Sequence, residues 1–165
     1  MSKPTTGAEE VYWDLSDLYP SSNSDELKQD TSDILKKAEA FGQHYRGKIS
    51  ELDAPAFRKM LEEYESLQDT AGKIGSFAYL QWSTDTSNAE YGKLVQQANE
   101  LSSEIQQKLV FLDVEWLGMD DEKAEYLIQS DELKKYKHYL ESSRRYKDHV
   151  LGEKEEQILS AKSVT

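Results

Sequence analysis

The side chains in this sequence best suited to bind a metal are its three histidines, His44, His138 and His149. A common zinc-binding helix carries two histidines four residues apart, with a glutamate between them, so that all three side chains share one helix face. None of the three histidines has another histidine four residues later. We therefore predict no metal-ligating residue in this chain.

Carboxylates and serines give no better evidence of catalysis. General acid–base chemistry needs two carboxylates whose surroundings separate their pKa values, and adjacent acids on an exposed helix face do not provide this. Ser76 lies within a helical pattern and lacks the Gly-x-Ser-x-Gly surroundings of a nucleophile. We assign no catalytic or cofactor-binding residue. The adjacent acids are Glu62-Glu63, Asp120-Asp121 and Glu155-Glu156.

Gly72 and Gly75 lie three residues apart inside a helical pattern. Each glycine in a helix interior costs about 1 kcal/mol relative to alanine. They do not form a phosphate loop, because no strand pattern precedes them and no Gly-Lys-Ser/Thr follows. A close helix–helix approach at a face shared with Ala71 and Ala78 would offset the cost, and we predict tight packing there.

The segment 134–147 combines basic residues with tyrosines, which can bind nucleic acid. Its apolar positions Leu133, Tyr136 and Leu140 form one helix face, and most of the basic residues fall outside it. A solvated helix, or one docked on an acidic neighbour, fits this pattern better. Nucleic-acid binding would need a steeply salt-dependent affinity in spite of the net charge of −12.

Composition narrows the class of protein further. The chain has 165 residues, enough for one domain, of which 37% are hydrophobic and 32% charged. The acidic balance disfavours nucleic acid and anionic membranes as partners. The chain has no cysteine for a disulfide or thiolate zinc site, and no apolar run near the ~20 residues of a membrane span. Residues 1–10 lack the apolar core of a signal peptide. We expect a cytoplasmic protein.

Helical periodicity accounts for nearly all of the chain. The first helix is expected to begin near Ser22–Ser24 and to end at Arg46-Gly47. The second follows Asp53, accepts Pro55 in its first turn and runs to about Trp82. The third begins near Ser87, which has capping-box spacing to Glu90, and continues to about residue 117. The apolar stripes are Leu27, Ile34, Ala38, Phe41 and Tyr45; then Phe57, Met60, Tyr64, Leu67, Ala71, Ile74 and Ala78; then Tyr91, Leu94, Ala98, Leu101, Ile105, Leu109, Leu112 and Trp116.

The short turn between the second and third helices predicts an antiparallel hairpin of about 55–82 and 87–117. The fold class is therefore all-α, an elongated helical bundle built on that hairpin. A short helix is expected at about 121–129, another from Ser130-Asp131 to about Tyr146, and a last one from about Gly152. We expect 1–20 to be a disordered N-terminus with an aromatic arm, and 21–165 to be the helical domain.

Five segments in order resemble the N-terminal region of the oligoendopeptidase F-type zinc metallopeptidases of the M3 (M3B) family. Each is weak alone, but the ordered set is specific. Gly152 departs from the family, which has serine there. The segments are Trp13–Tyr19; Gly75–Leu80 followed by Asp85-Thr86; Phe111–Leu117 with Glu115 at the acid; Tyr136, His138, Tyr139 and Leu140 followed by Arg144-Arg145; and His149–Leu159.

The resemblance implies that this chain is the N-terminal part of a longer cytoplasmic peptidase, truncated before the catalytic domain. It implies a wall or lid of the channel in which short peptides are hydrolysed, with the parent's catalytic domain as partner. Zinc is expected in the full-length enzyme and not in this chain, which lacks the His-Glu-x-x-His motif and should be inert alone. An excised domain would also expose apolar surface, so self-association is expected.

A stand-alone acidic helical module that binds a partner protein is the alternative reading of the same hairpin. The reading frame beyond Thr165 separates the two hypotheses, since a downstream His-Glu-x-x-His motif supports the peptidase and a stop codon supports the module.

Overall fold

The computed structural model describes residues 13–145 together with Lys147, Glu155, Ile158 and Lys162. Across these residues the chain is helical and contains no strand, so the predicted all-α class is confirmed. Residues 1–12 and most of the predicted last helix from Gly152 lie outside the described residues. The elements are α1 (Asp25–Tyr45), η1 (Ile49–Glu51), α2 (Ala54–Thr84), α3 (Ala89–Leu109), α4 (Phe111–Gly118), α5 (Asp121–Ile128), η2 (Asp131–Tyr136) and α6 (Lys137–Arg144).

Helix α1 begins and ends at the residues that the sequence predicts. The Ser24 hydroxyl accepts a hydrogen bond from the backbone N–H of Leu27, which satisfies one of the first-turn donors. The helix ends before Gly47, whose φ of +76° lies in the left-handed region that glycine adopts without strain. Every residue of the predicted apolar stripe is buried.

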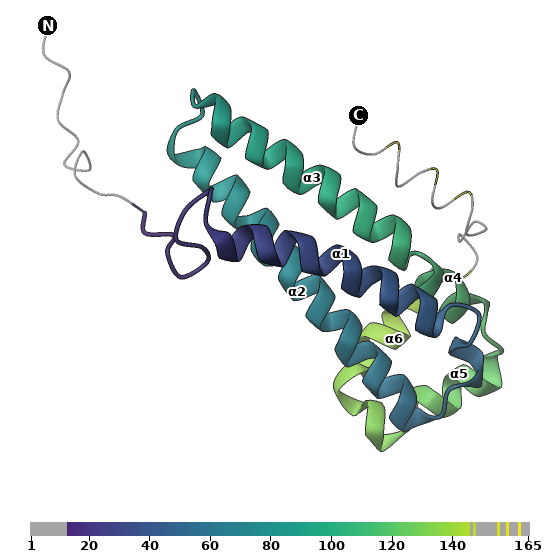
Figure 1. Cartoon of the computed structure of the whole chain (residues 1–165). Helices are drawn as coiled ribbons and strands as arrows, with labels where there is room; N and C mark the ends of the chain where they lie inside the picture. Colours follow the sequence, from purple (N-terminus) through teal and green to yellow (C-terminus); the bar gives the residue numbers. More distant parts are fainter. Residues whose placement is uncertain (1–12, 146, 148–154, 156–157, 159–161, 163–165) are drawn as a thin grey trace, which may run out of the picture.

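The predicted hairpin is present as α2 and α3, which lie side by side over most of their length (Figure 1). The Asp53 carboxylate caps α2 by accepting from Ala56 N–H at 2.9 Å. The start of the third helix is one or two residues later than predicted. Asn88, rather than Ser87, accepts from the backbone N–H of Glu90, because the Ser87 hydroxyl donates to Asp85 at 2.6 Å instead.

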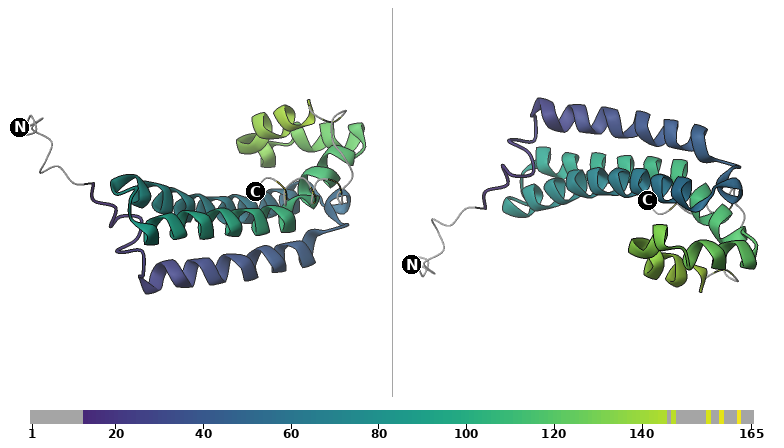
Figure 2. Two further views of the ribbon diagram at one scale, coloured as in Figure 1. Left: turned by 90° about the horizontal axis from the view of Figure 1, so that it is seen from above. Right: turned by 90° about the horizontal axis from the view of Figure 1, so that it is seen from below.

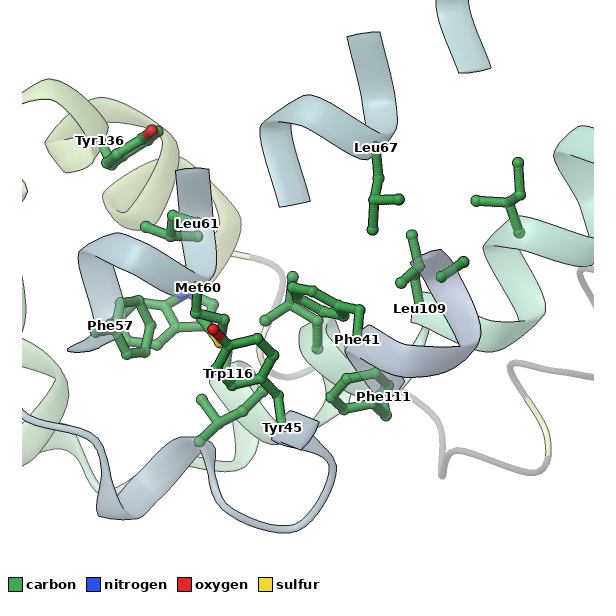
Figure 3. Packing of buried hydrophobic residues seen from close by; sticks show 14 of the residues in the cluster. Phe41, Tyr45, Phe57, Met60, Leu61, Leu67, Leu109, Phe111, Trp116 and Tyr136 are labelled. Atoms are coloured by element: carbon green, nitrogen blue, oxygen red, sulfur yellow. The ribbon is translucent and has the colours of Figure 1, made fainter. Parts of the chain in front are cut away.

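Three layers of helices form the molecule (Figure 2). Helix α1 packs on one face of the α2–α3 hairpin, and α5, η2 and α6 lie on the other face near one end of it. A continuous apolar core joins them, and Figure 3 shows aromatic rings from α1, α2 and α4 gathered in it. The arm before α1 is tied to this core by Tyr19, whose ring packs against Phe77 with centroids 5.3 Å apart.

The third predicted helix, 87–117, is wrong as a single element, because it bends at Val110 into α3 and α4. The physical reason is burial. Four consecutive residues, Leu109–Leu112, are all buried. One face of a straight helix holds residues three and four apart, so it cannot bury four in a row. The bend turns Phe111 toward α1, where its ring lies 6.0 Å from that of Phe41.

The predicted tight packing face at Gly72 and Gly75 is also wrong. A Cβ atom added to either glycine would meet nothing within 4 Å, and Gly72 is exposed. The helix contact at a glycine occurs instead in α1, where a Cβ on buried Gly42 would lie 3.6 Å from the Lys108 carbonyl oxygen. The apolar stripe of α2 was assigned correctly, but the glycines lie beside it, on a flank that α1 and α3 do not reach.

Candidate functional site

A cleft of about 310 Å³ opens between α2, α3 and the bend into α4. Its wall combines an apolar floor with polar side chains from all three helices. We call it the hairpin cleft. It is lined by Tyr64, Gln68, Ala71, Ser102, Ile105, Gln106, Leu109, Val110 and Asp113.

Two tyrosine hydroxyls meet beside this cleft. Tyr64 of α2 and Tyr139 of α6 are hydrogen-bonded to each other, and the Gln68 side chain is hydrogen-bonded to Tyr64. Burial raises the pKa of both tyrosines, and the nearby Asp113 carboxylate raises both further because it disfavours a second negative charge. Although 40% of the Tyr139 surface is exposed, its hydroxyl end is the desolvated part.

Alkaline titration should reveal this pair. A phenol whose folded pKa is raised stabilises the fold below its ordinary pKa of 10.0 and loses that contribution as pH rises toward the folded pKa. We expect Tyr139→Phe to remove one late-titrating group from the near-ultraviolet tyrosinate absorbance and to raise the pKa of Tyr64, because the hydrogen bond from Tyr139 lowers that pKa. Tyr126→Phe, at an exposed position of α5, serves as the control and should leave the late phase of the absorbance change as it is in the wild type. An unchanged late phase in Tyr139→Phe would contradict the assignment.

Trp116 of the third motif and Arg144 of the fourth motif hold α4, α5 and α6 together. The Trp116 indole N–H donates to the Ser143 hydroxyl at 2.9 Å. The Arg144 guanidinium donates to the carbonyls of Trp116 and Met119 at 2.9 and 3.2 Å, and also pairs with Asp121. These contacts satisfy backbone groups at the end of α4, so this part of the motif is structural.

Other basic residues of 134–147 pair with acids as well. Lys135 contacts Glu65 of α2 at 2.6 Å, and the same carboxylate accepts from the Tyr136 hydroxyl at 2.8 Å. Lys147 contacts Asp121 at 2.6 Å. These lysines therefore dock on acidic neighbours, which is one of the two outcomes that the sequence predicts for this segment.

Glu115, the acid of the third motif, binds the loop after α1. Its two carboxylate oxygens accept from the backbone N–H groups of Gly47 and Ile49 at 2.6 and 3.4 Å. A carboxylate holds such donors more strongly than a neutral amide does. The loop that ends α1 is therefore fixed by α4, on the far side of the bend.

The substitution Glu115→Gln should destabilise the fold by about 1 kcal/mol, the difference between a charged and a neutral hydrogen-bond acceptor. Chemical denaturation measures this free energy of unfolding. Glu122→Gln, an exposed first-turn position of α5, is the matched control and should change it by less than about 0.5 kcal/mol. Equal effects of the two substitutions would show that the Glu115 contacts do not contribute to the free energy of unfolding.

The structure brings the histidines to no common site. His44 packs edge-on to Tyr45 with ring centroids 4.5 Å apart, and His138 lies 3.5 Å from the Ser142 hydroxyl. His149 lies outside the described residues. Within 13–145 and the four further described positions, no three metal-ligating side chains are grouped to hold an ion. In the same part of the chain, no helix is long and apolar enough to cross a membrane.

The polar residues of the hairpin cleft were missed in the sequence. Tyr64 was assigned to the apolar stripe of α2, and Gln68, Ser102, Gln106 and Asp113 were not singled out. A signal was available, since Gln68 follows Tyr64 and Gln106 follows Ser102 by four residues, each pair flanking an apolar stripe. That spacing alone does not show that the two helix flanks line the same cleft.

Known proteins match this chain over most of its length. A family model described as oligopeptidase F, covering the N-terminal part of M3 peptidases, matches residues 115–165. Oligopeptidase PepF of Bacillus subtilis is 27% identical over 152 residues, which are 92% of this chain and 22% of that protein. The oligoendopeptidase F homolog of Borreliella burgdorferi is 28% identical over 148 residues, 90% of this chain and 24% of that protein.

The group B oligopeptidase PepB of Streptococcus agalactiae is 26% identical over 170 residues, 99% of this chain and 27% of that protein. The chain thus spans about a quarter of the length of these curated relatives. No solved structure gives a significant match. The ordered motifs, the family model and the relatives together support the similarity of this chain to the N-terminal region of oligoendopeptidase F-type peptidases of the M3 family.

Proposed function

We propose that this chain forms a helical wall or lid of the channel in an oligoendopeptidase F-like zinc metallopeptidase that hydrolyses short peptides. The observation that carries the proposal is the extent of the match: nine tenths of this chain aligns with about a quarter of the relatives named as oligopeptidases. The catalytic zinc and its ligands are then placed in the remaining part of the longer protein, and the catalytic domain is the principal partner of this chain.

The arrangement of helices supports this role. Helix α1 lies on one face of the α2–α3 hairpin (Figure 2). The hairpin cleft includes Tyr64, which is hydrogen-bonded to Tyr139 of α6. A braced hairpin is stiff and resists bending by a substrate.

We propose that residues 21–165 form the helical domain, that 1–20 precede it as an arm, and that the protein is cytoplasmic. In isolation the domain is proposed to self-associate through the surface that otherwise meets the catalytic domain, and sedimentation at high concentration tests this.

The 165-residue chain alone should not hydrolyse peptides. The test incubates it with a short internally quenched peptide, with and without added zinc, and follows fluorescence and product masses. No cleavage under either condition is expected, and zinc-dependent cleavage by the chain would refute the proposal.

The reading frame beyond residue 165 gives an independent test. A downstream His-Glu-x-x-His motif is expected. A stop codon directly after Thr165 would overturn the proposal in favour of a self-contained module that binds a partner protein.

A further inference from the structure

Two aromatic side chains lie on the surface of α2, toward the end of the hairpin that is farther from α4 (Figure 1). Tyr79 is 59% exposed and Trp82 is half-buried, and their ring centroids lie 6.0 Å apart. Among the described residues, neither ring belongs to the apolar core or to the lining of the hairpin cleft. Tyrosine and tryptophan are enriched at the centres of protein–protein interfaces, so this pair marks a surface that can bind another protein.

The segment that carries this pair is uncharged. Residues 74–84 contain no acidic or basic side chain, although 32% of the whole chain is charged. Depletion of charge together with exposed aromatic rings is typical of the centre of an interface. A partner on this surface is therefore held by shape and apolar contact rather than by ion pairs.

Gly72 and Gly75 share one side of α2 with the two aromatic residues. The four positions follow one another at intervals of three, four and three residues, which a helix of 3.6 residues per turn brings to one face. A Cβ atom added to either glycine would meet nothing within 4 Å, so two hollows lie beside two bulky rings. We call the set Gly72, Gly75, Tyr79 and Trp82 the glycine–aromatic face.

The spacing of this face is symmetric about residue 77. The glycines precede residue 77 by five and two positions, and the aromatic residues follow it by two and five. When a second copy of α2 lies antiparallel across a two-fold axis at that level, Tyr79 of each copy meets Gly75 of the other, and Trp82 meets Gly72. A two-fold interface requires a surface that is complementary to itself, and large side chains opposite glycines provide this.

The charge of the chain favours the same surface. Two copies with a net charge of −12 each repel one another wherever charged surfaces meet. The run 74–84 is the longest uncharged stretch in the sequence, so repulsion between two copies is weakest there. A different partner protein would need no two-fold symmetry in the spacing, whereas a second copy does.

We propose that two copies of this chain pair through the glycine–aromatic face, with their α2 helices antiparallel about a two-fold axis near residue 77. The inference rests on the self-association put forward with the proposed function, to which it gives a surface, a symmetry and a register. A contact of about three helical turns is small. The dimer therefore forms at high concentration and dissociates on dilution.

Sedimentation equilibrium of the 165-residue chain measures this association. We expect dimers and no larger species, because a two-fold contact closes on itself. Gly75→Gln should weaken the dimer by about tenfold or more, since the new side chain fills the hollow that receives Tyr79. Gly118→Gln makes the same change at an exposed glycine at the end of α4, where a Cβ also meets nothing within 4 Å, and should leave the association unchanged.

Loss of folding cannot explain this pattern. Gly75→Gln replaces a glycine in a helix interior with a better helix former, so circular dichroism of a dilute sample should show the helix content and the thermal midpoint preserved or raised. Tyr79→Ser, which removes the ring that fills the hollow, should weaken the dimer as well. Raising NaCl from about 50 to about 500 mM should strengthen the wild-type dimer, because salt screens the like charges of the two copies.

Cysteine cross-linking tests the register, since the chain has no cysteine of its own. A ¹⁵N-labelled Gly72→Cys variant is mixed with unlabelled Ser83→Cys and oxidised, and mass spectrometry identifies the linked pairs. In the antiparallel pair these two positions lie at nearly the same level, whereas each lies about 15 Å or more along the axis from the same position in the other copy. A disulfide needs Cα atoms within about 7 Å. We therefore expect mixed disulfides well above the share that random pairing gives.

Four outcomes would overturn the inference. They are a wild type that stays monomeric at millimolar concentration, association that salt weakens or that extends beyond dimers, a Gly75→Gln or Tyr79→Ser variant that associates as strongly as the wild type, and disulfides that form as readily between identical copies. Each leaves the proposed function standing, because that function fails instead if the chain by itself cleaves peptides or if its reading frame stops at Thr165.

Discussion

Replacing Phe111 with alanine is expected to lower the free energy of unfolding by about 3–5 kcal/mol, the usual cost of deleting a fully buried aromatic ring. The Phe111 side chain is 0% exposed. Its ring lies 6.0 Å from that of Phe41, and the Arg46 guanidinium stacks over it at 4.6 Å. Since domains of this size are stable by only about 5–15 kcal/mol, the loss is a large part of the total. Urea denaturation followed by circular dichroism measures it.

Tyr126→Ala is the control for this experiment, because Tyr126 is 65% exposed on α5 and its removal should cost less than about 0.5 kcal/mol. Phe111→Leu should fall between the two, as it keeps part of the buried volume. A loss below about 1 kcal/mol for Phe111→Ala would show that the site collapses without a cavity, and that the bend at Val110 does not depend on this ring.

The double substitution Gly72→Ala and Gly75→Ala should stabilise the chain by about 2 kcal/mol, from about 1 kcal/mol at each interior helix position. Both positions have room for a methyl group, so no clash offsets the gain in helix propensity. The midpoint of urea denaturation should therefore rise.

Gly47→Ala provides the contrast with the same chemical change. Gly47 has a φ of +76°, where a side chain is strained by about 1–2 kcal/mol, so this variant should be destabilised. If the Gly72 and Gly75 substitutions proved destabilising too, these two glycines would have to have a packing partner in the free chain, as the sequence analysis predicts.

Local patterns in the sequence were enough to locate most helices. The caps at Ser24 and Asp53 act within one turn, and an apolar stripe at three-to-four spacing repeats along a helix whatever it packs against. The same argument predicted the hairpin, since a four-residue connection leaves α3 no other place to pack than beside α2. The ordered motifs supplied the family, which the relatives confirm.

The bend at Val110 and the hairpin cleft could not be predicted from local patterns in the sequence. The sequence shows that Leu109–Leu112 are apolar, but only the position of α1 decides that all four are buried and that the helix must turn at Val110. Gln68 is far from Gln106 and Asp113 in the chain, and these residues meet because α2, α3 and α4 converge there.

The sequence by itself therefore determined the helices, their apolar faces and the family, because these depend on contacts within a few residues or on residue order. The tertiary structure decided which helix flanks stay open. It left room beside Gly72 and Gly75 and brought the polar groups of the hairpin cleft together, because the crossing of packed helices depends on all the side chains between them at once.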